Sequence, residues 1–144
     1  MKKSIALLLI LVLIFCCACD SAEYADVTPR VEFVEGVCIQ RTNVEDGKYT
    51  YFEKKIDDPA LIAGFCEQID HLNFSKIDPQ KFSSADFLII YEGKKEHKMY
   101  VSGNKIMYND LAYEAVSGDL IKKISELYNK IDQQETAAES RLFK

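Results

Sequence analysis

The sequence FLIIY at residues 87–91 decides the fold expected for this chain. Its side chains are apolar or aromatic at both odd and even positions, which is typical of a strand buried on both faces at the centre of a sheet. Shorter strand patterns follow at His97–Val101, Lys105–Tyr108 and Ala112–Val116, with glycine and asparagine turns between them. This half of the chain therefore predicts an antiparallel meander built outward from one central strand.

Two paired strands are expected before this central strand. Val31–Gln40 alternates between apolar and polar side chains, and Glu35 breaks the alternation in the manner of a β-bulge. The Asp46-Gly47 pair favours the positive φ angles of a two-residue hairpin turn, and Tyr49–Ile56 after it is rich in strand-forming residues. The two segments are predicted to pair antiparallel. Phe74–Ile77 is a further short strand.

Two helices are expected, each with a single apolar stripe. The first begins at Asp58-Pro59, because Asp accepts hydrogen bonds from the free N–H groups of a first turn and Pro loses no needed donor there. The second is expected to have Ser117 as its cap, with Asp119 in its first turn. The stripes consist of Leu61, Ile62, Phe65, Cys66, Ile69 and Leu72 in the first helix, and of Leu120, Ile121, Ile124, Leu127, Tyr128 and Ile131 in the second.

These elements predict an α+β fold. We expect a curved antiparallel sheet of about five to six strands with two helices packed on one face, in the order β-β-α-β-β-β-β-α. Because each helix has only one apolar stripe, the opposite face of the sheet is expected to be open to solvent. Phe65 and Ile124 should be buried against the central strand around Ile89.

The first 18 residues have the layout of a secretory signal peptide. Lys2 and Lys3 precede an unbroken apolar segment, Ile5–Phe15, and the chain turns polar at Asp20. Even when Cys16, Cys17 and Ala18 are included, this run of about 14 residues is shorter than the ~20 that a membrane-spanning helix needs, which argues against a permanent span. Residues 1–18 are therefore expected to be cleaved.

The sequence Cys16-Cys17-Ala18-Cys19 resembles the lipobox of bacterial lipoproteins, because a cysteine follows a small residue and precedes a polar one. The resemblance implies that the signal is cut just before Cys19 and that the Cys19 thiol carries the lipid. It also implies a stable anchor on the extracytoplasmic face of the cell membrane. Cys16 stands where the lipobox usually has an aliphatic residue, and Cys17 is an alternative acceptor. A plain signal peptide with chance cysteines is the other interpretation.

The expected mature chain is a single acidic domain. We expect residues 19–29 to form the lipidated N-terminus and a tether, 30–132 a single α+β domain, and 133–144 a polar tail. Loss of Lys2 and Lys3 leaves 16 of the 18 basic side chains against 23 acidic ones, a net charge of −7. Such a domain is a poor nucleic-acid binder, so its expected contact with the membrane is through the lipid.

The domain resembles the small sheet-and-helix domains of many Gram-positive lipoproteins. In element order alone, it is also similar to the half-repeat of the TATA-binding-protein-like fold. No sequence motif accompanies this second resemblance.

Two cysteines, Cys38 and Cys66, follow the signal region. A single disulfide between them is one possibility for a protein outside the cell. Buried free thiols that behave as small apolar side chains are the other. The sequence leaves both open.

The rest of the chain lacks the residue patterns of common active sites. It contains only His71 and His97 as imidazole bases, and it has no Gly-x-Ser-x-Gly elbow, phosphate-binding glycine loop or Cys-x-x-Cys pair after the signal region. Glu67 and His71 share a helix face, but a plain solvated surface is the more common explanation, and Glu96-His97 is weaker still. The chain is expected to be non-enzymatic, with no cofactor and no metal.

Tyrosine is the residue type that suggests a binding surface. On an open sheet face, tyrosines offer a large contact area at low entropic cost, which favours a module that binds a protein, a peptide or a cell-wall component. Strand parity assigns Tyr51 and Tyr100 to the open face. The tyrosines on strands or strand ends are Tyr49, Tyr51, Tyr91, Tyr100, Tyr108 and Tyr113.

Other interpretations of these tyrosines and of the function stay open. The tyrosines could simply fill half-buried strand positions, where tyrosine is favoured anyway. An inhibitor or regulator of a secreted or membrane enzyme is the second functional hypothesis, and an acidic loop that enters a partner's cleft would favour it. A hydrolase or metal carrier is the third.

Overall fold

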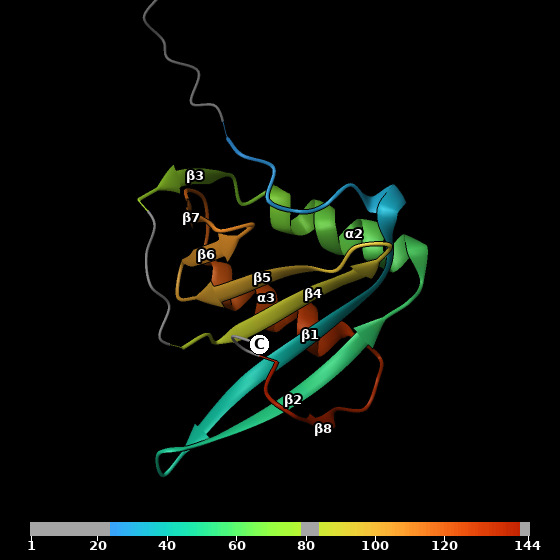
Figure 1. Ribbon diagram of the computed structural model, residues 1–144, viewed down its shortest axis with the longest axis vertical. Coiled ribbons are helices and arrows are strands. Elements are labelled where there is room, and N and C mark those ends of the chain that lie inside the picture. Colours follow the sequence, from blue (N-terminus) through green and yellow to red (C-terminus); the bar gives the residue numbers. More distant parts are fainter. Residues whose placement is uncertain (1–23, 79–83, 142–144) are drawn as a thin grey trace, which may run out of the picture.

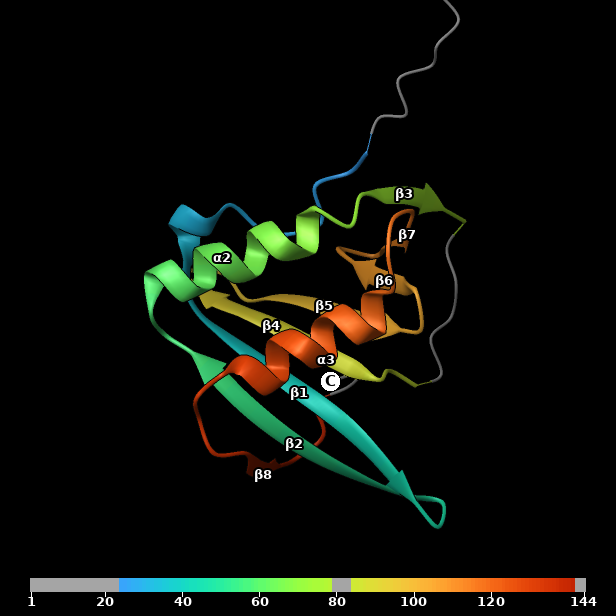
Figure 2. The ribbon, with the colours of Figure 1, turned by 180° about the vertical axis from the view of Figure 1, so that it is seen from behind.

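The computed structural model describes residues 24–78 and 84–141 of the chain. The expected signal peptide, the lipobox and Cys19 lie outside these residues. Within them the chain forms one open antiparallel sheet of eight strands with two helices on one of its faces (Figures 1 and 2). This confirms the predicted α+β class, with eight strands where about five to six were expected. The strands are β1 (Val34–Glu45), β2 (Lys48–Ile56), β3 (Phe74–Ile77), β4 (Phe87–Gly93), β5 (His97–Ser102), β6 (Lys105–Tyr108), β7 (Leu111–Ala115) and β8 (Thr136–Ala138), and the helices are α2 (Pro59–Asp70) and α3 (Leu120–Lys130).

The order of strands across the sheet is β3-β7-β6-β5-β4-β1-β2-β8. Strand β4, which contains FLIIY, lies between β1 and β5, and Phe87–Tyr91 is buried throughout, as a central strand requires. Strand β3 follows α2 in the chain but pairs with β7 at the far edge. The sheet is therefore a meander from β4 to β7 with a hairpin on one side and a returning edge strand on the other.

The β1–β2 hairpin forms as its sequence predicts. Asp46 and Gly47 have positive φ angles of 50° and 74°, and Glu45 pairs with Lys48 across the two-residue turn. The register of β1 against β4 shifts between Val34 and Gly36, at the predicted bulge.

The expected strand start at Val31 is wrong. Val31–Phe33 forms a short 3₁₀ helix, η1, in which the Phe33 N–H donates to the Arg30 carbonyl at 3.0 Å. The physical reason is that residues 31–33 have no paired strand beside them, because β4 ends at Gly93, opposite Val34. Without a partner strand, the backbone bonds locally.

Helix α2 begins where the sequence predicts, but one residue of its stripe was misplaced. The Asp58 carboxylate accepts from the backbone N–H groups of Ala60 at 2.8 Å and Leu61 at 3.1 Å. Leu61 was expected in the buried stripe, yet it is 63% exposed, because the face of α2 that contacts the core is narrower than expected and consists of Ile62, Phe65, Cys66 and Ile69.

Helix α3 begins two residues later than expected, and Asp119 is its cap. The Asp119 carboxylate accepts from the Lys122 N–H at 3.0 Å. The Ser117 hydroxyl instead donates to the Leu72 carbonyl at 2.7 Å, which ties the β7–α3 loop to the end of α2. The prediction that Ser117 caps α3 is therefore wrong. Its hydroxyl bonds to the Leu72 carbonyl, which is distant in sequence.

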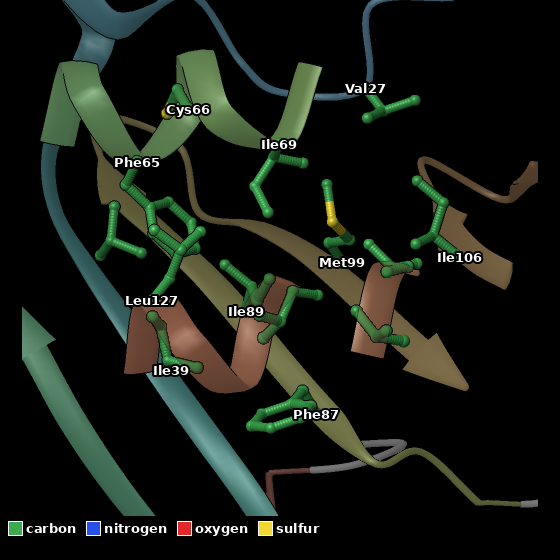
Figure 3. Packing of buried hydrophobic residues seen from close by; sticks show 14 of the residues in the cluster. Val27, Ile39, Phe65, Cys66, Ile69, Phe87, Ile89, Met99, Ile106 and Leu127 are labelled. Atoms are coloured by element: carbon green, nitrogen blue, oxygen red, sulfur yellow. The ribbon is translucent and has the colours of Figure 1, made fainter. Parts of the chain in front are cut away.

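The main core lies between the two helices and the sheet. Phe65 of α2 and Leu127 of α3 lie over Ile89 of β4 (Figure 3). Phe65, Ile124 and Ile89 are at most 3% exposed and belong to one apolar cluster, which confirms the predicted core.

Residues 25–29, which were expected to belong to a tether, pack onto the domain instead. The Ala25 N–H donates to the Phe74 carbonyl at 2.9 Å, and Val27 is fully buried. The Asp70 carboxylate accepts from the Val27 N–H at 3.4 Å and from the Thr28 hydroxyl at 2.5 Å. The folded domain therefore begins at Ala25 or before it, because Ala25, Val27 and Thr28 are hydrogen-bonded to β3 and to the last residue of α2.

Candidate functional site

The open face is the side of the sheet that points away from α2 and α3. Residues directly opposite each other in an antiparallel sheet lie on the same face, so the register places every strand residue. Cys38 pairs with Lys55 on one side and Ile90 on the other, and Tyr100 pairs with Leu88. Three tyrosines lie on the open face, namely Tyr49, Tyr51 and Tyr100, and three lie on the helix side, namely Tyr91, Tyr108 and Tyr113.

The register thus places both sequence-predicted residues, Tyr51 and Tyr100, on the open face, and each is half-buried. They are on different strands, β2 and β5, with β1 and β4 between them. Tyr100 packs against a small apolar cluster of Cys38, Leu88 and Ile90. This cluster is itself at most 1% exposed, so the expectation that this face is open to solvent is wrong at the centre of β1 and β4, and the face is not a broad apolar patch.

The most exposed apolar side chains of the open face are at the end of the β1–β2 hairpin. Val44 and Tyr49 are opposite each other in the register and are each 55% exposed. Tyr51 follows on the same face two residues along β2. Figure 1 shows the hairpin extending beyond the rest of the sheet, which makes both of its sides accessible. Tyr49 is one of the strand tyrosines, and the sequence pattern alone does not distinguish it from the others.

The C-terminal strap, which we define as residues 133–141, crosses the edge of the sheet and then its open face (Figure 1). Its strand β8 pairs with Tyr51, Phe52 and Glu53 of β2. The residues expected only as a polar tail are therefore paired with the sheet from Thr136 to Ala138. The physical reason is that β2 would otherwise be an edge strand. Its unpaired N–H and C=O groups can form hydrogen bonds with an extended segment that lies beside them.

A buried glutamine fastens the strap to the open face. The Gln40 amide donates to the Glu139 carbonyl at 2.9 Å and accepts from the Arg141 N–H at 3.2 Å, and Gln40 is 1% exposed. The Arg141 guanidinium lies 3.9 Å from the Glu53 carboxylate. On the helix side, Arg41 forms an ion pair of 2.9 Å with Glu135. The strap is therefore held by directed polar contacts rather than by apolar burial.

A hollow of about 250 Å³ lies beside Tyr100 at the opposite end of the open face. Its wall includes Lys98 and Met107 together with residues of the β4–β5 and β6–β7 turns. The open face therefore has an accessible aromatic residue at each end, and the strap covers β1 and β2 between them.

The two cysteines are free and buried, so the disulfide alternative is wrong. Cys38 belongs to the open-face cluster and Cys66 to the core under α2, and the sheet separates them. Burial, reinforced by the nearby carboxylates of Glu53 and Asp70 respectively, raises the pKa of Cys38 to about 12 and that of Cys66 to about 11. Both thiols stay protonated at neutral pH and are poor nucleophiles.

The polar pairs noted in the sequence do not assemble into a site. Glu67 and His71 lie 3.8 Å apart, but their side chains are 70% and 73% exposed. His97 is 3.5 Å from Asn109 and lies beside the Tyr108 ring. Within residues 24–78 and 84–141, no three His, Cys, Asp or Glu side chains gather closely enough to hold a metal ion.

No helix in the described part of the chain combines the length and the apolar character needed to cross a membrane. Comparison of the chain with family models, with curated proteins and with solved structures found no match. What the structure defines is an α+β domain with an eight-stranded sheet among its described residues.

Proposed function

We propose that this chain is a bacterial lipoprotein, anchored by Cys19 on the extracytoplasmic face of the cell membrane. The support is the charged start, the apolar segment and the small-residue-cysteine junction of residues 1–20. Five residues separate Cys19 from Ala25, the first residue hydrogen-bonded to the domain, and an extended chain of that length spans about 20 Å. An anchored domain would therefore stay close to the membrane surface.

Replacing Cys19 with Ala is expected to abolish lipidation and cleavage of residues 1–18. Intact-mass analysis of membrane-extracted protein should show that the unaltered chain begins at Cys19 and carries a diacylglycerol adduct. Cys17→Ala serves as the control and should be processed normally. A membrane-bound chain that still contains Lys2 and Lys3 and carries no lipid would contradict the anchor.

We infer further that the domain is a non-enzymatic binding module that contacts a protein, peptide or cell-wall partner through its open face. The observation that carries this proposal is the cluster of Val44, Tyr49 and Tyr51 on a projecting hairpin, with Tyr100 at the other end of the same face. Paired aromatic and aliphatic side chains of this kind are large, rigid and only half solvated, which suits contact with a partner.

The test places a photo-crosslinking phenylalanine analogue at single positions of the anchored protein in growing cells. Positions 49, 51 and 100 should give the same covalent adduct by mass spectrometry. Leu61, which is 63% exposed on α2, is the matched control and should give none. Equal yields at position 61, or no adduct at any open-face position, would contradict the binding face.

A second variant separates binding from folding. Replacing Tyr51 and Tyr100 together with Ser should greatly reduce crosslinking from position 49 and lower the melting temperature only moderately, because both side chains are half-buried and Tyr100 packs against the small apolar cluster. A large fall in melting temperature would instead show that these tyrosines belong to the core.

One feature favours the second hypothesis, an inhibitor or regulator of a secreted or membrane enzyme. The tip of the projecting hairpin is Glu45-Asp46-Gly47-Lys48, whose residues are all exposed. A narrow acidic loop of this kind could enter a partner's cleft. A crosslinking residue in place of Lys48 distinguishes the two functions, since only an inhibitor would give an adduct within an enzyme's active-site cleft from that position.

A further inference from the structure

A second pocket, of about 330 Å³, lies on the helix side of the sheet and shares Lys95 and His97 with the hollow beside Tyr100. One wall is the N-terminal segment from Pro29 to Val34, and the other is the β4–β5 turn. The floor contains the rings of Tyr91 and Tyr108, which are 1% and 7% exposed. The pocket is at the small end of the range for ligand sites.

The walls of this pocket are held together by a close backbone approach. A Cβ atom added at Gly93 would lie 2.2 Å from the Phe33 carbonyl oxygen, a distance that real Cβ atoms do not reach. Glycine thus lets η1 pack directly against the end of β4. Phe33 itself is 63% exposed beside the pocket, although it is a large apolar side chain.

The charged side chains that line the pocket are basic, whereas the whole chain is acidic. The full sequence has 23 acidic and 18 basic residues, yet the pocket is lined by Arg30, Lys94 and Lys95 and by no carboxylate. Within the described residues, the side chains of Lys94 and Lys95 form no ion pair or hydrogen bond. Arg30 has only an exposed contact of 3.9 Å with Glu32. Unpaired cations beside an apolar cavity favour an anionic ligand.

The floor also contains a polar atom without a partner. The Tyr91 hydroxyl is buried and has no hydrogen-bond partner among the described residues. The Tyr128 hydroxyl, outside the pocket, is in the same state, so the unpartnered Tyr91 hydroxyl does not by itself point to a ligand. Burial raises the Tyr91 pKa well above its ordinary value, so the hydroxyl remains a neutral donor.

We propose that this pocket binds a small amphipathic anion, a carboxylate with an apolar body. The apolar body would lie against Phe33, Tyr91 and Tyr108, and the carboxylate would contact Lys94 and Lys95 at the rim. A volume of about 330 Å³ accommodates roughly ten non-hydrogen atoms, since one water takes about 30 Å³ of liquid. This proposal does not depend on the open face or on the lipid anchor.

The test uses decanoate as the probe and calorimetry as the measurement. Residues 20–144 serve as the protein, because they retain every described residue of the domain. Decanoate should bind with one site per chain, and decyltrimethylammonium, which has the same apolar tail and the opposite charge, should bind at least tenfold more weakly. Equal binding of the two would overturn the proposal.

Variants assign the binding to the pocket. Lys94→Ala with Lys95→Ala should weaken decanoate binding at least tenfold, and Lys122→Ala with Lys130→Ala, which removes the same charge from exposed positions of α3, should not change it. Both pairs are exposed, so neither should unfold the domain. Equal loss in both pairs would show unspecific attraction and overturn the proposal. Binding to phosphatidylglycerol vesicles without any binding of decanoate would also overturn it, because the cations would then serve a membrane surface.

Discussion

Replacing Phe65 with Ala is expected to lower the free energy of unfolding by about 3–5 kcal/mol. Phe65 is 3% exposed and packs between α2, α3 and the central strand, so its removal leaves a cavity at the junction of all three (Figure 3). Urea denaturation followed by circular dichroism measures the change. The loss is large beside the 5–15 kcal/mol that stabilises an ordinary domain.

Leu61→Ala is the matched control for this prediction. It removes an apolar side chain from the same helix, but Leu61 is 63% exposed and contributes little buried surface. Its effect should be within about 0.5 kcal/mol. Similar losses for the two variants would contradict the orientation of α2 on the sheet.

Replacing Gly93 with Ala is expected to lower the free energy of unfolding by roughly 3 kcal/mol, which is a large loss for the addition of one methyl group. The new Cβ would lie 2.2 Å from the Phe33 carbonyl oxygen, and the obstructing atom belongs to the backbone, which cannot move aside as a side chain can. Relief requires η1 to move away from β4. The same movement would deform the pocket, so decanoate binding should weaken together with stability.

Gly64→Ala is the control for the general effect of replacing glycine, and it is expected to raise the free energy of unfolding rather than lower it. Gly64 is inside α2, and a Cβ there has no neighbour within 4 Å. Alanine should stabilise the helix by about 0.5–1 kcal/mol, because it loses less backbone entropy on folding. A stabilising Gly93→Ala would show that η1 does not pack against β4 as described.

The candidate site was only partly predictable. The parity of β2 and β5 places Tyr51 and Tyr100 on the open face as soon as their strands are recognised, because side chains alternate along a strand. The Gln40 contacts with the strap could not be predicted, since Gln40 and Arg141 are 101 residues apart and β8 is only Thr-Ala-Ala. The rim of basic residues likewise combines Arg30 with Lys94 and Lys95, which only the packing of η1 on β4 brings together.

The sequence by itself determined the features that depend on neighbours along the chain. The Asp46-Gly47 turn, the start of α2 at Asp58-Pro59 and the buried strand FLIIY all follow from local backbone preference and from the spacing of apolar residues. Only the tertiary structure decided which groups form hydrogen bonds with the ends of the helices and the edge of the sheet. Asp119 rather than Ser117 caps α3 because a distant carbonyl, that of Leu72, takes the Ser117 hydroxyl. Unpaired backbone groups at a sheet edge or a helix end form hydrogen bonds with the segment that the fold places beside them. That segment is distant in the chain, so the local sequence does not identify it.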